Sequence, residues 1–349
     1  MTAASFTLHA GPRAARWVAE RGLAPEHIAC IPAAAGGPKG LALIPLDQRL
    51  FGGWLGDAQP ERIGASIGAW RMLASAQRDA VAALQRLADT YVAQTYPPDP
   101  PPARVSAECR KLARAALGNG LGALQPGAIV HALAARARGP LAGRRSRAAF
   151  ARAAAANLAG RSRLAAYMER VAFGVGRSRV LAAPFDAFGL HSVPLSEVNA
   201  EDALLASGSI PLICDPVAAP AGAPSGEYWD GGLIDYHLRL PYARLDGIVL
   251  YPHFAPQVTA GWLDKLLPWR RHRRGDPWLD NVLLIAPSPA LLARLPNGKL
   301  PDRNDFLRYG ADNVARQRDW RRAIAECERM ADEVMAWLDD PQPQVIQPL

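Results

Sequence analysis

Short apolar runs alternate with stretches of helical periodicity along most of this chain. The apolar runs, which are typical of buried strands, cover residues 27–31, 178–183, 189–193, 248–251 and 282–285. Helices are predicted over 12–21, about 70–91, 196–205 and about 302–337. Short apolar strands that alternate with helices indicate a mostly parallel sheet covered on both faces, so the pattern predicts an α/β fold.

Two segments depart from this alternation. A proline-rich spacer begins at residue 97, and the Ala/Arg-rich stretch after it contains helical patches interrupted by glycine. We therefore expect 97–177 to be a helical insertion that could cap a site. The core of a single domain, 1–349, would comprise 27–96 and 178–255, followed by a C-terminal extension over 256–349.

Composition narrows the class of protein. Half of the 349 residues are hydrophobic, which allows a sizeable core, and the net charge is +8. A basic surface suits nucleic acid, anionic lipid or acidic metabolites, but no RRM, KH or zinc-finger spacing is present, so nucleic acid is not expected as a partner.

The cysteines and the apolar runs bear on the location of the protein. Its four cysteines stand far apart, at Cys30, Cys109, Cys214 and Cys327, so disulfide and zinc frameworks are not expected and a reducing compartment fits. No signal peptide and no uninterrupted apolar run of about 18 residues is visible. We expect a cytoplasmic protein that needs no metal or other cofactor.

The strongest candidate for chemistry is Ser66, which lies between Gly64 and Gly68 in a G-x-S-x-G pattern. A serine at the tip of a strand–turn–helix adopts a strained backbone, and neighbours without Cβ atoms leave room for the crossing strand and helix. At a helix start, Ser66 would lie beside free N–H groups that can hold an oxyanion. The same pattern also fits a tight βα turn without catalytic function.

Two other glycine-containing segments add to this candidate. Residues 36–40, with the sequence GGPKG, follow a predicted strand and precede a helix, which directs backbone N–H groups at an anion. Lys39 is not followed by Ser or Thr, so the segment is not a phosphate-binding Walker loop. Asp230 precedes Gly231 and Gly232, and by composition alone this triplet is typical of a turn.

Four segments together resemble the patatin-like phospholipases: 36–40, 64–68, the ASGSIP stretch at 206–211, and 230–232. That family has a glycine-rich oxyanion loop, G-x-S-x-G, A-S-x-A-x-P and D-G-[GA] in this order. The resemblance covers about residues 27–255.

The resemblance implies a three-layer α/β/α patatin-like fold and a Ser–Asp dyad that cleaves lipid esters. Ser66 would be the nucleophile, and Asp230 would take its proton and later activate water. The oxyanion hole would be formed by the elbow residue and the glycine loop, namely Ile67, Gly36, Gly37, Lys39 and Gly40.

This sequence departs from the family pattern at a few positions. Ala35 replaces the first loop glycine, Pro38 has no N–H to donate, and Ser209 stands where alanine is usual. None of these differences removes the dyad, but they leave substrate choice open.

Other readings of the residues remain open. His191, His237 and His253 all follow Ser66, so a Ser–His or Ser–His–Asp esterase or acyltransferase is an alternative. A second alternative is a non-catalytic protein that uses the glycine loop to bind anionic lipid head groups.

One further segment suggests contact with a membrane surface. Residues 261–274 combine two tryptophans and three leucines with four arginines, which an interfacial anchor on anionic lipid needs. The residues that would make this contact are Trp262, Trp269, Arg270, Arg271, Arg273 and Arg274. An amphipathic loop packed on the domain is the alternative.

Overall fold

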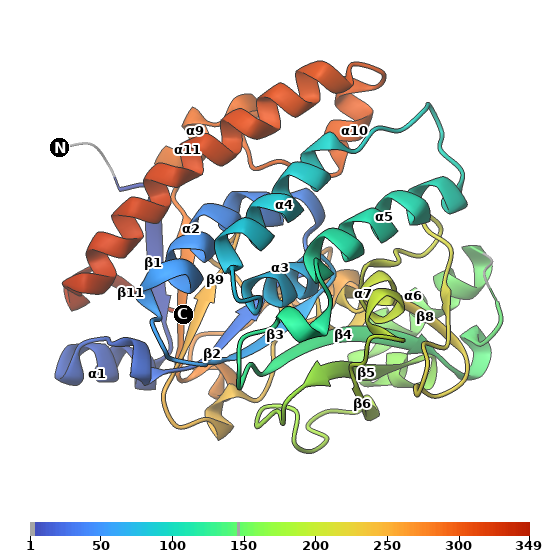
Figure 1. Ribbon diagram of the computed structural model, residues 1–349. Helices are drawn as coiled ribbons and strands as arrows, with labels where there is room; N and C mark the ends of the chain where they lie inside the picture. Colours follow the sequence, from blue (N-terminus) through green and yellow to red (C-terminus); the bar gives the residue numbers. More distant parts are fainter. Residues whose placement is uncertain (1–3, 145–146) are drawn as a thin grey trace.

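A mixed, mostly parallel β-sheet forms the centre of the protein, with helices on both faces (Figure 1). We analysed a computed structural model, which describes residues 4–144 and 147–349. Within those residues the sheet has 11 strands, in the order β11-β1-β10-β9-β2-β3-β4-β5-β6, with β8 on β4 and β7 on β8. The predicted three-layer α/β/α fold is therefore confirmed.

The strands have the following bounds: β1 (Phe6–Ala10), β2 (Ile28–Ala33), β3 (Glu61–Ala65), β4 (Val130–Ala137), β5 (Met168–Val175), β6 (Leu190–Pro194), β7 (Val217–Ala218), β8 (Glu227–Asp230), β9 (Ile248–Pro252), β10 (Val282–Pro287) and β11 (Ile346–Pro348).

The α-helices have the following bounds: α1 (Pro12–Arg21), α2 (Ile44–Arg49), α3 (Ile67–Ser75), α4 (Ala80–Ala93), α5 (Pro102–Leu117), α6 (Arg147–Ala159), α7 (Ala200–Gly208), α8 (Gly232–Asp235), α9 (Pro289–Arg294), α10 (Asn304–Tyr309) and α11 (Asn313–Asp339).

The middle of the sheet is parallel and positions the candidate site. Strands β10, β9, β2, β3 and β4 pair in parallel, so the carboxyl ends of β2 and β3 open at the same edge. The glycine loop follows β2 and Ser66 follows β3. Ligands of open α/β sheets bind at this edge of the strands, so the topology alone brings these two segments together.

Several predicted elements are confirmed with small shifts. The apolar runs at 27–31, 189–193, 248–251 and 282–285 are strands, and residues 12–21 form α1. The run at 178–183 is a turn, where the Ser178 hydroxyl accepts a hydrogen bond from the N–H of Leu181. Its apolar side chains Val180 and Leu181 are buried without belonging to the sheet.

Three predicted helices have different limits. The helix expected over 70–91 is two helices, α3 and α4, because the Asp79 side chain caps the start of α4 by accepting a bond from Ala82 N–H. The helix expected at 196–205 begins at Ala200, since Ser196 lies in a preceding turn. The helix expected over 302–337 is interrupted at Gly310, which has a φ of 52°.

Residues 97–177 differ most from the prediction. They contain the expected helices α5 and α6, but they also supply β4, which pairs with β3, and its antiparallel neighbour β5. The segment is therefore part of the core rather than an insertion beside it. Alanine-rich β4 has a high helix propensity, yet its position between buried neighbours makes it a strand, because tertiary burial outweighs local preference.

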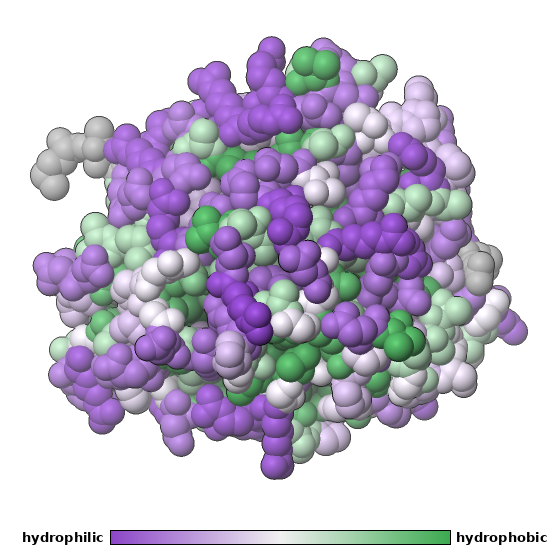
Figure 2. All heavy atoms as spheres, in the orientation of Figure 1, coloured by the Kyte–Doolittle hydropathy of each residue, from purple (hydrophilic) through white to green (hydrophobic). Residues whose placement is uncertain are grey.

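The C-terminal region is also part of the core rather than an extension. Strand β10 pairs with β9 and β1, and the long helix α11 packs against α2 (Figure 1). The face shown in Figure 2 carries mostly hydrophilic residues with scattered hydrophobic ones. Within the described residues, no helix combines the length and the hydrophobicity needed to cross a lipid bilayer.

Candidate active site

Ser66 occupies a strained turn between β3 and α3. Its backbone has φ 56° and ψ −129°, a region that residues with a Cβ rarely adopt. Such a conformation costs about 1–3 kcal/mol and persists only where its surroundings hold it in place. The predicted strand–turn–helix around Ser66 is thus confirmed, including its strain.

Gly64 and Gly68 are required by the close contact of the strand, the turn and the helix. A Cβ on Gly68 would lie 1.9 Å from the carbonyl oxygen of Ala33, and one on Gly64 would lie 2.3 Å from the carbonyl carbon of Gly68. Both clashes involve backbone atoms, which cannot move away. The structure therefore gives each glycine of the G-x-S-x-G pattern a steric reason.

The side chain of Ser66 donates a hydrogen bond to Asp230. Ser66 Oγ lies 2.8 Å from Asp230 Oδ2, although 164 residues separate them in sequence. The other oxygen of this carboxylate, Oδ1, accepts the N–H of Gly232 at 2.7 Å. Both carboxylate oxygens thus have a partner, which fixes the orientation of Asp230 toward the serine. A hydroxyl held by a carboxylate is an arrangement suited to removal of the serine proton.

Burial changes the acidity of Asp230. Its side chain is 6% exposed, and this burial raises the pKa of the carboxyl above that of an ordinary aspartate. The Arg303 guanidinium and the hydrogen bonds from Ser66 and Gly232 oppose this rise. A carboxylate of raised pKa that stays ionised is a stronger general base than an exposed aspartate.

Ser207 connects the elbow to the sheet, and the sequence analysis did not single it out. Its hydroxyl accepts the N–H of Ser66 at 2.9 Å and donates to the carbonyl of Leu133 in β4 at 2.7 Å. Its own carbonyl accepts the N–H of Gly231. One buried serine therefore links the segments that carry Ser66 and Asp230. Its place in the 206–211 stretch was the only signal that could have revealed it.

The glycine loop lies beside the elbow, at the end of β2. The N–H of Ala35 donates to the carbonyl of Tyr236 at 2.8 Å, and a Cβ on Gly36 would lie 2.6 Å from the Phe254 ring. Gly37, at φ 57°, begins a short 3-10 helix (Gly37–Leu43), just as Ile67 begins α3. First residues of helices have N–H groups without an intrahelical acceptor, so both can donate to a ligand.

Lys39 and Gly40 have different surroundings. A Cβ on Gly40 would lie 2.6 Å from the Ile67 side chain, so Gly40 lets the loop pack against the elbow. The Lys39 ammonium lies 5.0 Å above the Phe254 ring and lines the pocket, where burial and the nearby charge of Lys265 lower its pKa. Of the five residues predicted for the oxyanion hole, Gly36 and Lys39 line the pocket, whereas Gly37, Gly40 and Ile67 are not among its lining residues.

No hydrogen bond joins Ser66 to a histidine in the part of the chain that the structure describes, which includes all seven histidines. His191 lies 3.0 Å from Glu169 on a different part of the sheet. His237 and His253 are buried against each other, and their Nδ1 atoms accept N–H groups of nearby loop residues. Burial lowers the pKa of His253 to about 3. These contacts give no support to the Ser–His alternative.

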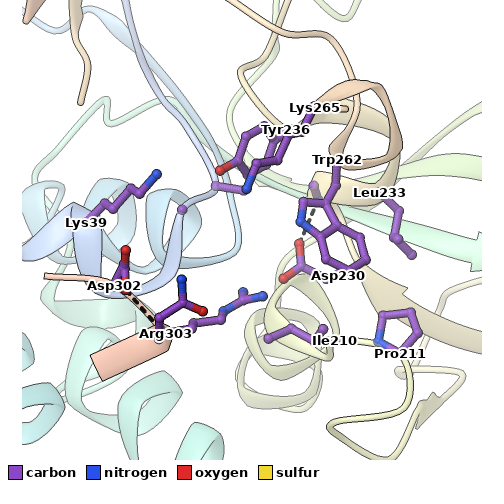
Figure 3. Close-up of a pocket in the computed structure, with 14 residues that line it drawn as sticks. Lys39, Ile210, Pro211, Asp230, Leu233, Tyr236, Trp262, Lys265, Asp302 and Arg303 are labelled. Atoms are coloured by element: carbon purple, nitrogen blue, oxygen red, sulfur yellow. Dashed lines mark hydrogen bonds between the residues drawn. The ribbon is translucent and has the colours of Figure 1, made fainter. Parts of the chain in front are cut away.

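A cavity of about 230 Å³ opens beside Asp230, as Figure 3 shows. Pockets for drug-sized ligands measure about 300–1,000 Å³, so this one can take the reacting end of a substrate but not a whole lipid. Its apolar part is formed by Ile210, Pro211, Leu233 and Trp262. None of the described residues that line it comes from 97–177, so the cap expected there does not cover this pocket.

The C-terminal region contributes the most unexpected pocket residue. Arg303, which precedes α10, extends toward Asp230 in Figure 3, and its Nε lies 3.1 Å from the point where a Cβ on Gly37 would be. With Arg303, Lys39 and Lys265, the pocket is lined by three basic side chains and by two acidic ones, Asp230 and Asp302. No local pattern in the sequence marks Arg303, because only the fold brings it close to residues more than two hundred positions away.

The described residues include no group of three or more His, Cys, Asp or Glu side chains arranged to hold a metal ion. The sequence matches no family model and no curated protein with which it was compared.

Proposed function

We propose that this protein is a serine acyl hydrolase that cleaves carboxylic ester bonds of lipids or similar acyl substrates. The observation that carries the proposal is the 2.8 Å hydrogen bond from Ser66 Oγ to Asp230 Oδ2, made by a serine in a strained turn at a helix start. The ordered resemblance of four segments to the patatin-like phospholipases supports it. In this proposal no metal or other cofactor takes part.

In the first half of the reaction, Asp230 takes the proton of Ser66 while Oγ attacks the ester carbonyl carbon. The negative charge that develops on the carbonyl oxygen is held by free N–H groups of Gly36, Gly37 and Ile67. Each such donor contributes about 3–4 kcal/mol to stabilising a transition state of this kind. The leaving alcohol receives the proton from Asp230, and an acyl-enzyme remains.

In the second half, Asp230 removes a proton from water, which attacks the acyl carbon. The tetrahedral intermediate collapses, Ser66 recovers its proton, and a free acid leaves. The small cavity holds the ester group and a few carbons, and the rest of a longer acyl chain lies outside it, along exposed apolar side chains such as Trp262. All four cysteines are free thiols, which agrees with the cytoplasmic location that we propose.

The test measures hydrolysis of p-nitrophenyl esters of increasing chain length, together with labelling by a fluorophosphonate probe. Ser66→Ala and Asp230→Asn should each lose activity, and Ser66→Ala should also lose labelling. Ser225→Ala and Asp246→Asn are matched controls, because both side chains are exposed and lie outside the pocket.

Two outcomes would contradict the proposal. An active Asp230→Asn variant, combined with a dead His191→Ala, His237→Gln or His253→Gln variant, would assign the base to a histidine. A folded wild-type protein that neither hydrolyses any ester nor reacts with the probe would exclude the hydrolase function.

A further inference from the structure

We call the cavity beside Asp230 the Ser66 pocket, because Asp230 lines it and accepts the hydrogen bond of Ser66, although Ser66 itself is not a lining residue. A second, more open cleft lies next to this pocket, and the proposed reaction makes no use of it. Its volume is about 590 Å³, and six arginines and two aspartates are among its lining residues. We call it the arginine cleft and define it by Arg161, Arg239, Arg270, Arg271, Arg273 and Arg274.

Two buried aspartates build the inner wall of this cleft. Asp264, which is fully buried, accepts hydrogen bonds from Arg161 at 3.2 Å and Arg270 at 3.0 Å. Asp276 binds Arg239 in a two-pronged pair, with one contact at 2.9 Å. The acidic groups of the cleft are therefore already paired with the three inner arginines.

The outer arginines have no such counter-charge. Across residues 4–144 and 147–349, the side chains of Arg271, Arg273 and Arg274 take part in no ion pair or hydrogen bond. The backbone that carries them is fixed, because His272 N–H donates to the Val258 carbonyl and Val258 N–H donates to the His272 ring. Arginine side chains without a counter-charge around a cleft are suited to binding phosphate groups.

Two apolar side chains project beside these arginines. Leu266 is 88% exposed and Trp269 is 65% exposed, and both lie in the short segment that separates the cleft from the Ser66 pocket. Trp262 and Lys265 of this segment line the pocket, whereas Trp269 lines the cleft. An exposed leucine offers nothing to a water-soluble polyanion, but leucine and tryptophan both gain free energy at a lipid interface.

We propose that the arginine cleft docks the protein on an anionic lipid surface. The phosphates of the head groups bind Arg271, Arg273 and Arg274, while Leu266 and Trp269 enter the interface between head groups and acyl chains. The mouth of the Ser66 pocket then faces the membrane, because both openings flank the same segment. This docking does not require catalysis by Ser66.

The test is co-sedimentation with vesicles, using the full chain with the Ser66→Ala substitution so that no lipid is consumed. Vesicles contain phosphatidylcholine alone or with about one third phosphatidylglycerol. We expect binding to the anionic vesicles only, with a loss of about 10-fold or more for the double variant Arg273→Gln/Arg274→Gln. Leu266→Ser/Trp269→Ala should also bind weakly and should lose the blue shift of tryptophan fluorescence on vesicle binding.

A matched control removes the same charge elsewhere. Arg321→Gln/Arg322→Gln changes two exposed arginines of α11 and should keep full binding. Equal losses in both double variants would overturn the proposal in favour of non-specific attraction to a basic protein.

Binding of inorganic phosphate that depends on Arg273 and Arg274, without vesicle binding, would assign the cleft to a soluble anion. Binding of an RNA homopolymer that depends on Arg273 and Arg274, without binding to vesicles, would assign it to nucleic acid. Each of these results contradicts lipid docking, whichever way the ester hydrolysis assay turns out.

Discussion

The Ser66 pocket and the arginine cleft lie on either side of the same short segment, and they differ in how far their polar side chains are paired within the protein. Beside the pocket, the Ser66 hydroxyl donates a hydrogen bond to Asp230, and the Ser66 N–H donates one to the Ser207 hydroxyl. The backbone of Ser66 is strained in the position where it makes both bonds. In the cleft, only the inner arginines are paired, and positive charge remains at the rim.

This difference follows from what each region would do in our proposals. A reacting group must be held in one orientation before the substrate arrives, so its hydrogen bonds are made within the protein. A docking surface gains affinity from charges that only the partner neutralises, so its charges stay unpaired in the free protein. The two regions can therefore be separated experimentally, because damage to one should leave the other intact.

The largest effect should separate chemistry from docking. Ser66→Ala should lower kcat for a water-soluble ester by about 10⁴-fold or more, because nothing else can supply the nucleophile. Its vesicle binding should not change. Arg273→Gln/Arg274→Gln should keep kcat/KM for the same ester within about twofold, because neither side chain lines the Ser66 pocket. If either variant lost both ester hydrolysis and vesicle binding, the two regions would form one site.

A large loss of stability is expected at the elbow. Gly68→Ala places a Cβ 1.9 Å from the Ala33 carbonyl oxygen, so the free energy of unfolding should fall by about 3 kcal/mol. Gly53→Ala is the matched control, because a Cβ there meets no atom within 4 Å, and it should change stability by less than about 0.5 kcal/mol. Urea unfolding measures both. Equal stabilities would mean that the elbow is less tightly packed than the structure describes.

A further effect concerns the dependence of stability on pH, which the buried histidines His131 and His253 should cause. Burial lowers the pKa of His131 to about 4 and that of His253 to about 3, so the folded protein keeps both rings neutral while the unfolded chain binds protons below about 6.5. Stability should therefore decrease as the pH falls through 6.5 toward 4, with a limiting slope of about 1.4 kcal/mol per pH unit for each histidine. Urea midpoints between pH 7 and pH 4.5 check this. His253→Gln should reduce the slope of the free energy of unfolding against pH by the contribution of one histidine. An unchanged slope would mean that His253 does not contribute to it.

A smaller effect is expected for Arg303. Its positive charge opposes the burial that raises the pKa of Asp230, so Arg303→Gln should raise this pKa further. The acid limb of the kcat/KM profile should then move to higher pH, since the base must be ionised to act. Arg308→Gln is the control, because Arg308 lies in α10, directly after Arg303, and does not line the pocket. A profile that does not move would show that the charge of Arg303 does not affect the pKa of the base.

The smallest effect is expected for Trp269 in the cleft. Because its side chain is 65% exposed, Trp269→Ala should change the free energy of unfolding by less than about 0.5 kcal/mol. Thermal and urea unfolding measure this in the absence of lipid. A larger loss would mean that Trp269 packs on the domain as an amphipathic loop, which was the alternative drawn from the sequence.

Local features of this protein could be predicted from its sequence. The turn at Ser66 needs glycine on both sides, and short apolar strands between helices need cover on both faces of a sheet. Both requirements involve residues close together in the chain, so composition and spacing reveal them.

Tertiary structure decided the rest. Alanine-rich β4 resembles a helix in isolation and becomes a strand only because β3 and β5 pair with it. The Ser207 bridge and the approach of Arg303 to Asp230 join segments far apart in the chain. The unpaired charge of the arginine cleft depends on which arginines Asp264 and Asp276 reach. Such contacts follow from how whole elements pack, and no local pattern of residues encodes them.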